Sequence, residues 1–166
     1  NSGHASRLIL ARINRATSCG DAGRFHEALG DFSKAAALLE IHGTRSTPEL
    51  RLLSSILHAN RARVFLHLGR SMDARTDAEK AIGFLNGLDP CTSVAEAAIK
   101  ARGILCRALA LQLDETGGQQ EEDWIASATD ATEEALSIVR TSGYRGAWLA
   151  DLVRYGARIY RVCQPH

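Results

Sequence analysis

The chain has 166 residues, which is long enough for one domain with a hydrophobic core of its own. Lysine and arginine total 20 against 19 aspartate and glutamate, so its charge does not favour nucleic acid or an anionic membrane as a partner. Alanine and leucine are abundant, aromatic residues make up 5 %, and there are three prolines, a composition that favours an all-helical protein.

The apolar pattern predicts seven helices, which group as three helix pairs and one last helix. In the helix that begins near Arg24, for example, apolar residues recur at i, i+3, i+4 and i+7. Thr47 and Pro48 have the residue types of an N-cap and a first helical position. A polar insertion, residues 114–122, lengthens the third turn. The expected helices cover residues 5–21, 24–41, 48–68, 71–86, 93–113, 123–140 and 144–162.

An internal repeat of 46 residues runs through these helices. Asn14-Arg15-Ala16, Asn60-Arg61-Ala62 and Cys106-Arg107-Ala108 follow one another at this spacing. Gly23 and Gly69 keep the same spacing, as do several alanines of the second helices. Small residues let two helices approach closely, and a glycine in a turn can adopt positive φ. The repeat therefore predicts helix pairs that stack in the same way along the chain.

The arginine in each of these three motifs, Arg15, Arg61 and Arg107, directly precedes a helix-facing alanine. We expect each to pack its stem along a neighbour or to pair with an acidic residue between repeats. The alternative is a functional ladder of cations.

The stretch 58–84 resembles one unit of a tetratricopeptide repeat (TPR), a helix–turn–helix module. The resemblance implies a single all-α domain over 1–166, folded as a right-handed α-α superhelix with three helix pairs and a C-terminal capping helix. The repeats would cover about 5–41, 48–86 and 93–140, with the capping helix at 144–162. A HEAT-like solenoid, with repeats of about 40–47 residues, is the alternative, but the spacing of the small residues favours the TPR.

In such a stack the first helix of each pair lines a concave groove, and the register of the repeat selects the residues that face it. Asparagine amides can hydrogen-bond a peptide backbone, and arginines can pair with a carboxylate. The alternative interpretation is that these are only solvated residues of a helix face. The candidate peptide-binding residues are Asn14, Thr17, Asn60, Arg63, His67, Arg102 and Cys106, with Leu109 beside them.

The stretch around Asn60 is also similar to TPR domains of co-chaperones that bind the acidic C-terminal tails of heat-shock chaperones. Asn60 matches the second-repeat asparagine of that clamp, and Arg102 keeps the charge of its third-repeat lysine. Ile13, Thr17 and Cys106 stand where the family has lysine, asparagine and arginine. The resemblance implies a protein or peptide partner with an acidic or C-terminal segment.

No enzyme motif is evident: the chain has no GxSxG, no HExxH and no phosphate-binding glycine loop. The chain has four cysteines without CxxC spacing, which favours a protein without metal or cofactor. It also has no apolar run of the roughly 18 residues that span a membrane, and together these features favour a cytoplasmic protein. We therefore expect a non-catalytic adaptor or co-chaperone-like module that binds a protein segment in its groove. The alternative is a structural or homo-oligomerisation scaffold that uses the capping helix or the convex face.

Overall fold

A computed structural model describes residues 2–43, 47–115 and 122–162. This part of the chain forms seven α-helices and no strand, which confirms the all-α prediction. The observed helix ends agree with the expected ones to within three residues, except at the start of the last helix. Residues 116–121 of the polar insertion lie outside the described residues. The helices are α1 (Ser2–Asp21), α2 (Phe25–His42), α3 (Pro48–His67), α4 (Ser71–Leu85), α5 (Thr92–Glu115), α6 (Glu122–Ser142) and α7 (Trp148–Val162).

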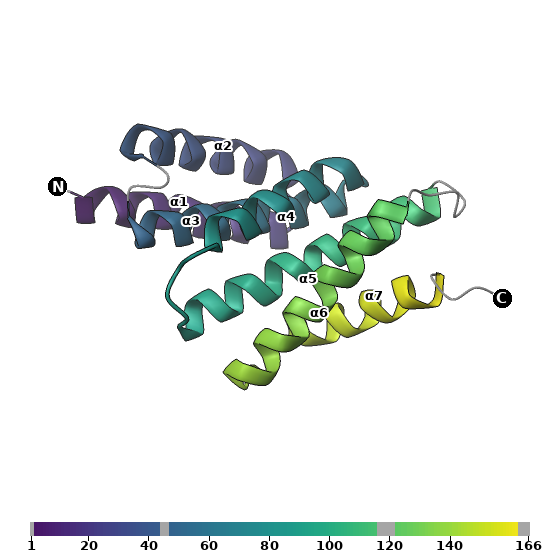
Figure 1. Cartoon of the computed structure of the whole chain (residues 1–166). Helices are drawn as coiled ribbons and strands as arrows, with labels where there is room; N and C mark the ends of the chain where they lie inside the picture. Colours follow the sequence, from purple (N-terminus) through teal and green to yellow (C-terminus); the bar gives the residue numbers. More distant parts are fainter. Residues whose placement is uncertain (1, 44–46, 116–121, 163–166) are drawn as a thin grey trace.

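Each helix packs against the next one or two helices along the chain (Figure 1). The first helices of the pairs and the last helix (α1, α3, α5 and α7, here the first helices) pack on one another in sequence. Each second helix (α2, α4 and α6) packs on its own first helix and on the following one. The first and last helices, α1 and α7, consequently lie at opposite ends of the helix stack (Figure 1). Within the described part of the chain, α3 and α5 each contact four other helices, and the remaining helices contact two.

The same kind of turn joins the two helices within each of the first two pairs. Gly23 and Gly69 adopt positive φ values of 75° and 69°, which a residue with a Cβ adopts only under strain. The amides of the following residues, Arg24 and Arg70, donate to carbonyls five residues earlier at 2.8 and 2.9 Å. Both turns thus satisfy carbonyls at the end of the preceding helix in the way of a glycine C-cap. The 46-residue repeat of the sequence is therefore also a repeat of the backbone.

Small residues fill the contacts inside each helix pair. Ala62 of α3 lies in the same buried cluster as Ala74 and Ala78 of α4, and all three are fully buried. Ala28 and Ala35 of α2 are likewise fully buried in a second cluster, formed with α1 and α3. Because a methyl group needs little room, the paired helices can approach closely along these faces.

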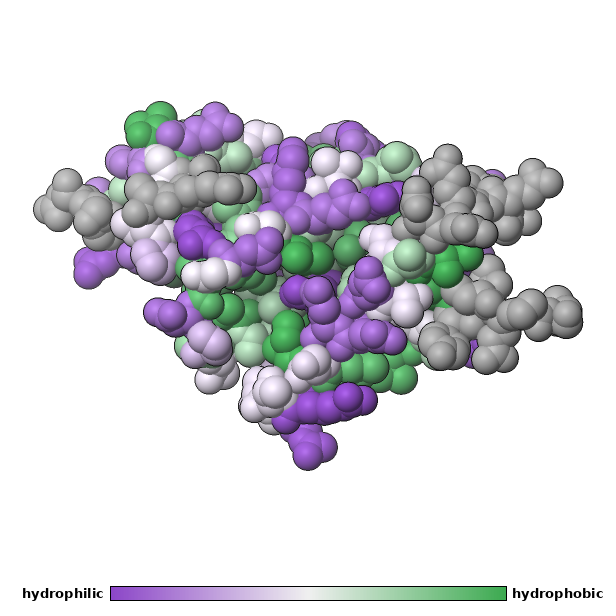
Figure 2. Space-filling model, in the orientation of Figure 1, coloured by the Kyte–Doolittle hydropathy of each residue, from purple (hydrophilic) through white to green (hydrophobic). Residues whose placement is uncertain are grey.

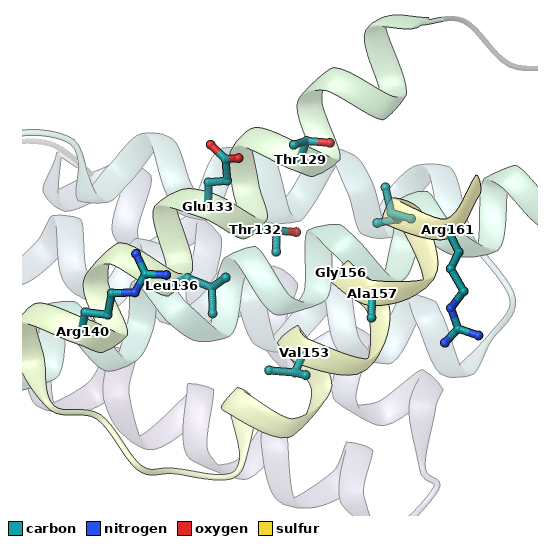
Figure 3. Close-up of a pocket in the computed structure, with 10 residues that line it drawn as sticks. Thr129, Thr132, Glu133, Leu136, Arg140, Val153, Gly156, Ala157 and Arg161 are labelled. Carbon is teal, nitrogen blue, oxygen red and sulfur yellow. The ribbon is translucent and has the colours of Figure 1, made fainter. Parts of the chain in front are cut away.

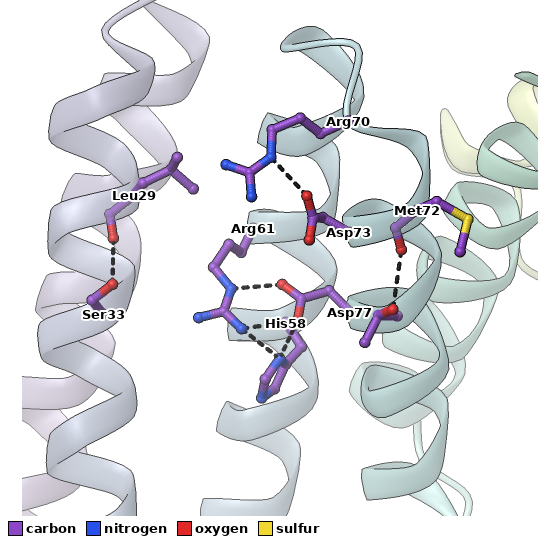
Figure 4. A network of polar contacts seen from close by, with 9 residues as sticks. Leu29, Ser33, His58, Arg61, Arg70, Met72, Asp73 and Asp77 are labelled. Atoms are coloured by element: carbon purple, nitrogen blue, oxygen red, sulfur yellow. Dashed lines mark hydrogen bonds and ion pairs between the residues drawn. The ribbon is translucent and has the colours of Figure 1, made fainter. Parts of the chain in front are cut away.

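Two ion pairs, each between an arginine and a buried aspartate, repeat inside the helix pairs. The Arg15 and Arg61 guanidiniums donate from Nε to Asp31 and Asp77 Oδ2 at 2.6 Å, each spanning 16 residues. Both carboxylates are buried, and His58 Nδ1 lies 3.0 Å from the second one (Figure 4). The expected pairing with an acidic residue is confirmed for these two arginines, but it links the helices of one pair rather than two repeats.

The last helix begins at Trp148, four residues later than expected. Gly143 ends α6 with a φ of 66°, and the Tyr144 phenol lies directly against the backbone of Gly146. A side chain at Gly146 would collide with this ring, so the glycine permits a compact connection. The apolar pattern of the sequence does not reveal this local packing.

Charged and polar side chains cover most of the face seen in Figure 2, with smaller apolar patches between them. Among the described helices none is long and apolar enough to cross a membrane.

Candidate functional site

A polar strip on α1 leads to α3. Asn14, Thr17 and Asp21 follow one another at helical spacing and so share a face of α1. Asn14 is exposed, and the half-buried Thr17 donates its hydroxyl to the Ile13 carbonyl at 2.9 Å. At the end of the strip, the Asp21 carboxylate accepts a hydrogen bond of 2.5 Å from Arg63 of α3. This ion pair connects the first two helix pairs.

Arg63 also belongs to a cluster that joins all four first helices. Its Cζ lies 6.0 Å from the ring centre of Trp148 on α7, and the Nζ of Lys100 on α5 lies 4.8 Å from the same ring. Lys100 donates a hydrogen bond to the Asn60 side-chain oxygen on α3. Asp21, Asn60, Arg63, Lys100 and Trp148 are called the Trp148 cluster below. Two cations on one aromatic ring are attracted by its electron-rich face, which fixes their positions.

The electrostatics of this cluster favour an additional negative charge. Burial, and then the nearby Arg63 cation, lower the pKa of Lys100 to about 8, although Glu96 and Asp21 act in the opposite direction. The lowered pKa means that the positive form of Lys100 is stabilised less here than in water. An anionic group placed beside Lys100 and Arg63 would relieve this imbalance.

A cavity of about 140 Å³ opens beside the cluster, between α3, α5 and α7. Two cationic side chains, Arg63 and Arg107, lie on its lining. The Arg107 guanidinium lies 5.7 Å from the ring centre of Tyr155, so α7 holds it in place by a second cation–π contact. The remaining lining residues are Leu66, Gly103, Ile104, Trp148 and Asp151.

The structure corrects the sequence prediction for the third repeat. Cys106 and Leu109 are fully buried, and Arg102 is only 9 % exposed. Arg102 pairs with Glu134 of α6 at 2.5 Å, and Cys106 Sγ lies 3.2 Å from the Thr132 hydroxyl of the same helix. Burial raises the pKa of the Cys106 thiol, which makes it a poor nucleophile. Cys106 and Leu109 are therefore part of the core, and Arg102 lines a groove between α4, α5 and α6 instead of the face that carries the Trp148 cluster.

The two remaining predicted residues are placed differently from each other. Asn60 is only 5 % exposed, so it takes part in the Trp148 cluster by supporting Lys100 rather than by meeting a peptide directly. His67 is exposed and stacks on Phe25 of α2, with ring centres 5.6 Å apart. His67 is therefore held against the first helix pair, apart from the contacts of the Trp148 cluster.

The predicted site residues did not include Asp21, Lys100 and Trp148, and Arg107 was considered only as part of an alternative ladder of cations. The error on α5 came from extending the 46-residue register from Asn60, which is itself buried, to the equivalent position Cys106 and its neighbours. A signal was present, because polar or small residues recur at helical spacing on the other face of α5. These are Glu96, Lys100, Gly103 and Arg107.

Among the residues that the structure describes, no group of three histidine, cysteine, aspartate or glutamate side chains is placed to hold a metal ion. Comparisons with known protein families, with curated proteins and with solved structures find no match for this chain.

Proposed function

We propose that the chain is a TPR-like α-α solenoid with right-handed stacking of three helix pairs and α7, and that it serves as an adaptor. It binds an acidic segment of another protein across the face of the first helices that carries the Trp148 cluster. The single observation that carries this proposal is Trp148 itself, which lies half-buried between Arg63 and Lys100 at the meeting point of α3, α5 and α7.

The packing order supports the solenoid part of the proposal. Contacts run only between near neighbours along the chain, as they do in repeat proteins. The turns at Gly23 and Gly69 and the pairs Arg15–Asp31 and Arg61–Asp77 recur at the repeat spacing. A stack of this kind presents its first helices on one continuous surface, which suits an extended ligand.

The chemistry of the face supports an acidic ligand. Tryptophan and arginine are the residues that most often dominate binding energy at protein interfaces, and this face offers both. Arg63 and Arg107 have the fork geometry that accepts a carboxylate with two hydrogen bonds. In the free protein Asp21 engages Arg63 with 58 % of its side chain exposed, so a ligand carboxylate can compete for it in solvent.

The test is a selection of binders from a random peptide library on the immobilised chain. The selected peptides are then titrated against wild type and an Arg63→Gln, Arg107→Gln variant, with Trp148 fluorescence as the readout in a Trp124→Phe background. We expect acidic peptides and a loss of affinity of about tenfold or more, since each lost charged hydrogen bond is worth about 1.5–3 kcal/mol.

The matched control removes two arginine charges elsewhere. Arg24 and Arg70 are exposed and form short-range surface ion pairs with Glu27 and Asp73, and Arg70 Cζ also lies 4.5 Å from the ring centre of Phe65. The Arg24→Gln, Arg70→Gln variant should bind the selected peptides as wild type does. Peptides that bind all three proteins equally, or that carry no acidic residues, would contradict the proposal.

A further inference from the structure

A second surface lies at the end of the helix stack, away from the Trp148 cluster. Here α6 and α7 form the two walls of a groove of about 840 Å³ (Figure 3). Its floor is apolar or small, with Leu136 on α6 and Val153, Gly156 and Ala157 on α7. Val153 is 54 % exposed, which is unusual for a large apolar residue of this chain. The polar lining residues are Thr129, Thr132, Glu133, Arg140 and Arg161.

Two smaller grooves inside the molecule show what this groove lacks. One of about 470 Å³ is walled by α2, α3 and α4, and the other, of about 440 Å³, by α4, α5 and α6. Each of these grooves is walled by the second helix of one pair and by both helices of the next pair. The groove at the end of the stack has α6 and α7 as its first two walls, and no helix among the described residues forms the third wall. This third wall would lie on α7, as α4 lies on α3 and α6 lies on α5.

The internal grooves also share an ion pair between two of their walls. In one, Arg61 of α3 binds Asp77 of α4 at 2.6 Å. In the other, Arg102 of α5 binds Glu134 of α6 at 2.5 Å. The arginine on the corresponding wall of the end groove is Arg161 of α7, which has no acidic partner within the described part of the chain. A carboxylate on the third wall would complete the same arrangement.

We propose that the groove between α6 and α7 binds an amphipathic α-helix of another polypeptide, which lies on α7 and presents a carboxylate to Arg161. The helix α4 shows the required face: Ala74, Ala78 and Ala81 pack on the first helix, and Asp77 reaches its arginine. The ligand helix therefore carries small residues at i, i+4 and i+7 and an acidic residue at i+3. Gly156 and Ala157 leave room for such a helix to approach α7 closely.

A second copy of the chain is a poorer occupant than a different polypeptide. The small-residue faces of α2, α4 and α6 are already buried in the clusters of their own chain. To offer one of them to a neighbour, the chain would have to open a helix pair and lose that buried surface.

The test uses a helical peptide with the sequence of residues 70–86, RSMDARTDAEKAIGFLN, cross-linked between positions 75 and 79 to hold the helix. The bound peptide would correspond to α4 in the groove between α2, α3 and α4. Glu79 does not line that groove but lines the one between α4, α5 and α6, so a cross-link there leaves the binding face free. Binding of the fluorescent peptide to the full chain is followed by anisotropy. We expect Val153→Asp and Arg161→Glu each to weaken binding by about tenfold or more.

A charge swap makes the test specific for Arg161. The peptide with Asp77→Lys should bind wild type poorly but should regain affinity for the Arg161→Glu chain. Arg145→Glu is the matched control, because this exposed arginine lies in the connection between α6 and α7 and is not among the groove-lining residues. Val153 is exposed, so its substitution leaves the fold intact, and circular dichroism of the variant checks this.

Three results would overturn the proposal. The peptide could bind no better than a scrambled, cross-linked version of the same composition. Its binding could be indifferent to Val153→Asp, which would place it on another surface. Sedimentation of the chain alone could reveal a dimer that Val153→Asp dissociates, which would make a second copy the occupant of the groove.

Discussion

The carboxylate of Asp77 is buried and yet remains ionised. Burial alone would raise its pKa, but hydrogen bonds from Arg61 and His58 outweigh that effect and lower the pKa below its ordinary value of 3.8. A lowered carboxyl pKa in the folded state stabilises the fold above the unfolded value. This contribution is lost as the pH falls through the lowered pKa, when the native carboxylate also becomes protonated.

Removing this charge is therefore expected to be costly near neutral pH. Asp77→Asn leaves the half-buried Arg61 without its ionic partner and should lower the free energy of unfolding by about 2–3 kcal/mol. Urea denaturation at neutral pH measures the loss, and the difference from wild type should shrink in acid. Asp73→Asn removes an exposed ion pair with Arg70 and a negative charge in the first turn of α4, so it should cost less, about 1 kcal/mol or under. Equal losses for both variants would contradict the importance of the buried pair.

The NMR signal of the Lys100 side chain provides a second test. The sequence contains three lysines, Lys34, Lys80 and Lys100, so the side-chain NMR spectrum of a lysine-labelled sample is simple. The Lys100 signal should titrate near pH 8. Arg63→Gln should raise this pKa, because the Arg63 cation is the second cause of the shift after burial. A Lys100 titration near 10.5 in wild type would contradict the burial and contacts described for the Trp148 cluster.

The same shift fixes how Lys100 affects stability. Between pH 8 and 10.5 the unfolded chain binds a proton at this side chain that the folded chain does not. Stability therefore falls as the pH is lowered through this range, and below it the cost is complete and no longer changes with pH. An acidic segment bound at the Trp148 cluster would raise the Lys100 pKa and remove part of this cost, since it supplies the missing negative charge.

At the scale of elements, α6 and α7 meet where a glycine faces a threonine. A Cβ at Gly156 would lie 2.7 Å from Thr132 Cγ2, too close for an ordinary contact. Gly156→Ala should destabilise the fold by about 1–3 kcal/mol through overpacking, although alanine itself favours the helix by about 1 kcal/mol. In a Thr132→Ala background the obstructing methyl and hydroxyl are gone, so the same substitution should be neutral or stabilising.

A control for this pair lies in α2. Nothing lies within 4 Å of a Cβ built on Gly30, so Gly30→Ala should stabilise the chain by up to about 1 kcal/mol in either background. Denaturant titrations of the single and double variants give the coupling energy. A Gly156→Ala variant as stable as Gly30→Ala would show that α6 and α7 are not in close contact at this point.

The elements themselves could largely be predicted from the sequence. Thr47 accepts a hydrogen bond from the Leu50 amide at 3.2 Å, and Pro48 begins α3, as their residue types indicated. Such signals are local, so a single stretch of sequence contains them. The start of α7 was predicted four residues too early, because the packing of Tyr144 on Gly146 leaves no trace in the apolar pattern.

Across the whole molecule, each helix contacts only its near neighbours along the chain. A destabilising substitution in one helix should therefore affect only the helices near it. Gly156→Ala loosens α7, so we expect faster amide exchange in α5, α6 and α7. Exchange in α1 and α2 should be unchanged, since neither helix contacts the disturbed ones. Hydrogen–deuterium exchange with mass spectrometry resolves the helices separately. Equal acceleration in α2 and α7 would instead indicate a single cooperative core.

The site could be predicted only in part, and the reason lies at this scale. Arg63 was among the predicted residues because the register of the repeat places it on the face of α3 that would line the groove. Arg102 and Cys106 were placed on the wrong face, because periodicity describes one helix and does not count the helices around it. Lys100 and Trp148 meet across α5 and α7, two helices whose mutual rotation no spacing in the sequence specifies.

The shared turn at Gly23 and Gly69 has a consequence for how the gene for such a chain could change. Because both glycines have nearly the same φ and the same hydrogen bond follows each, Gly23 can be joined directly to Arg70 without a new backbone conformation. That deletion removes one whole unit and leaves Arg15 sixteen positions before Asp77 in the shortened chain, the separation at which such pairs form. Duplication between the same points adds a unit equally smoothly. Recombination at these turns would therefore shorten or lengthen the molecule by whole units, and each new junction would keep the native turn conformation.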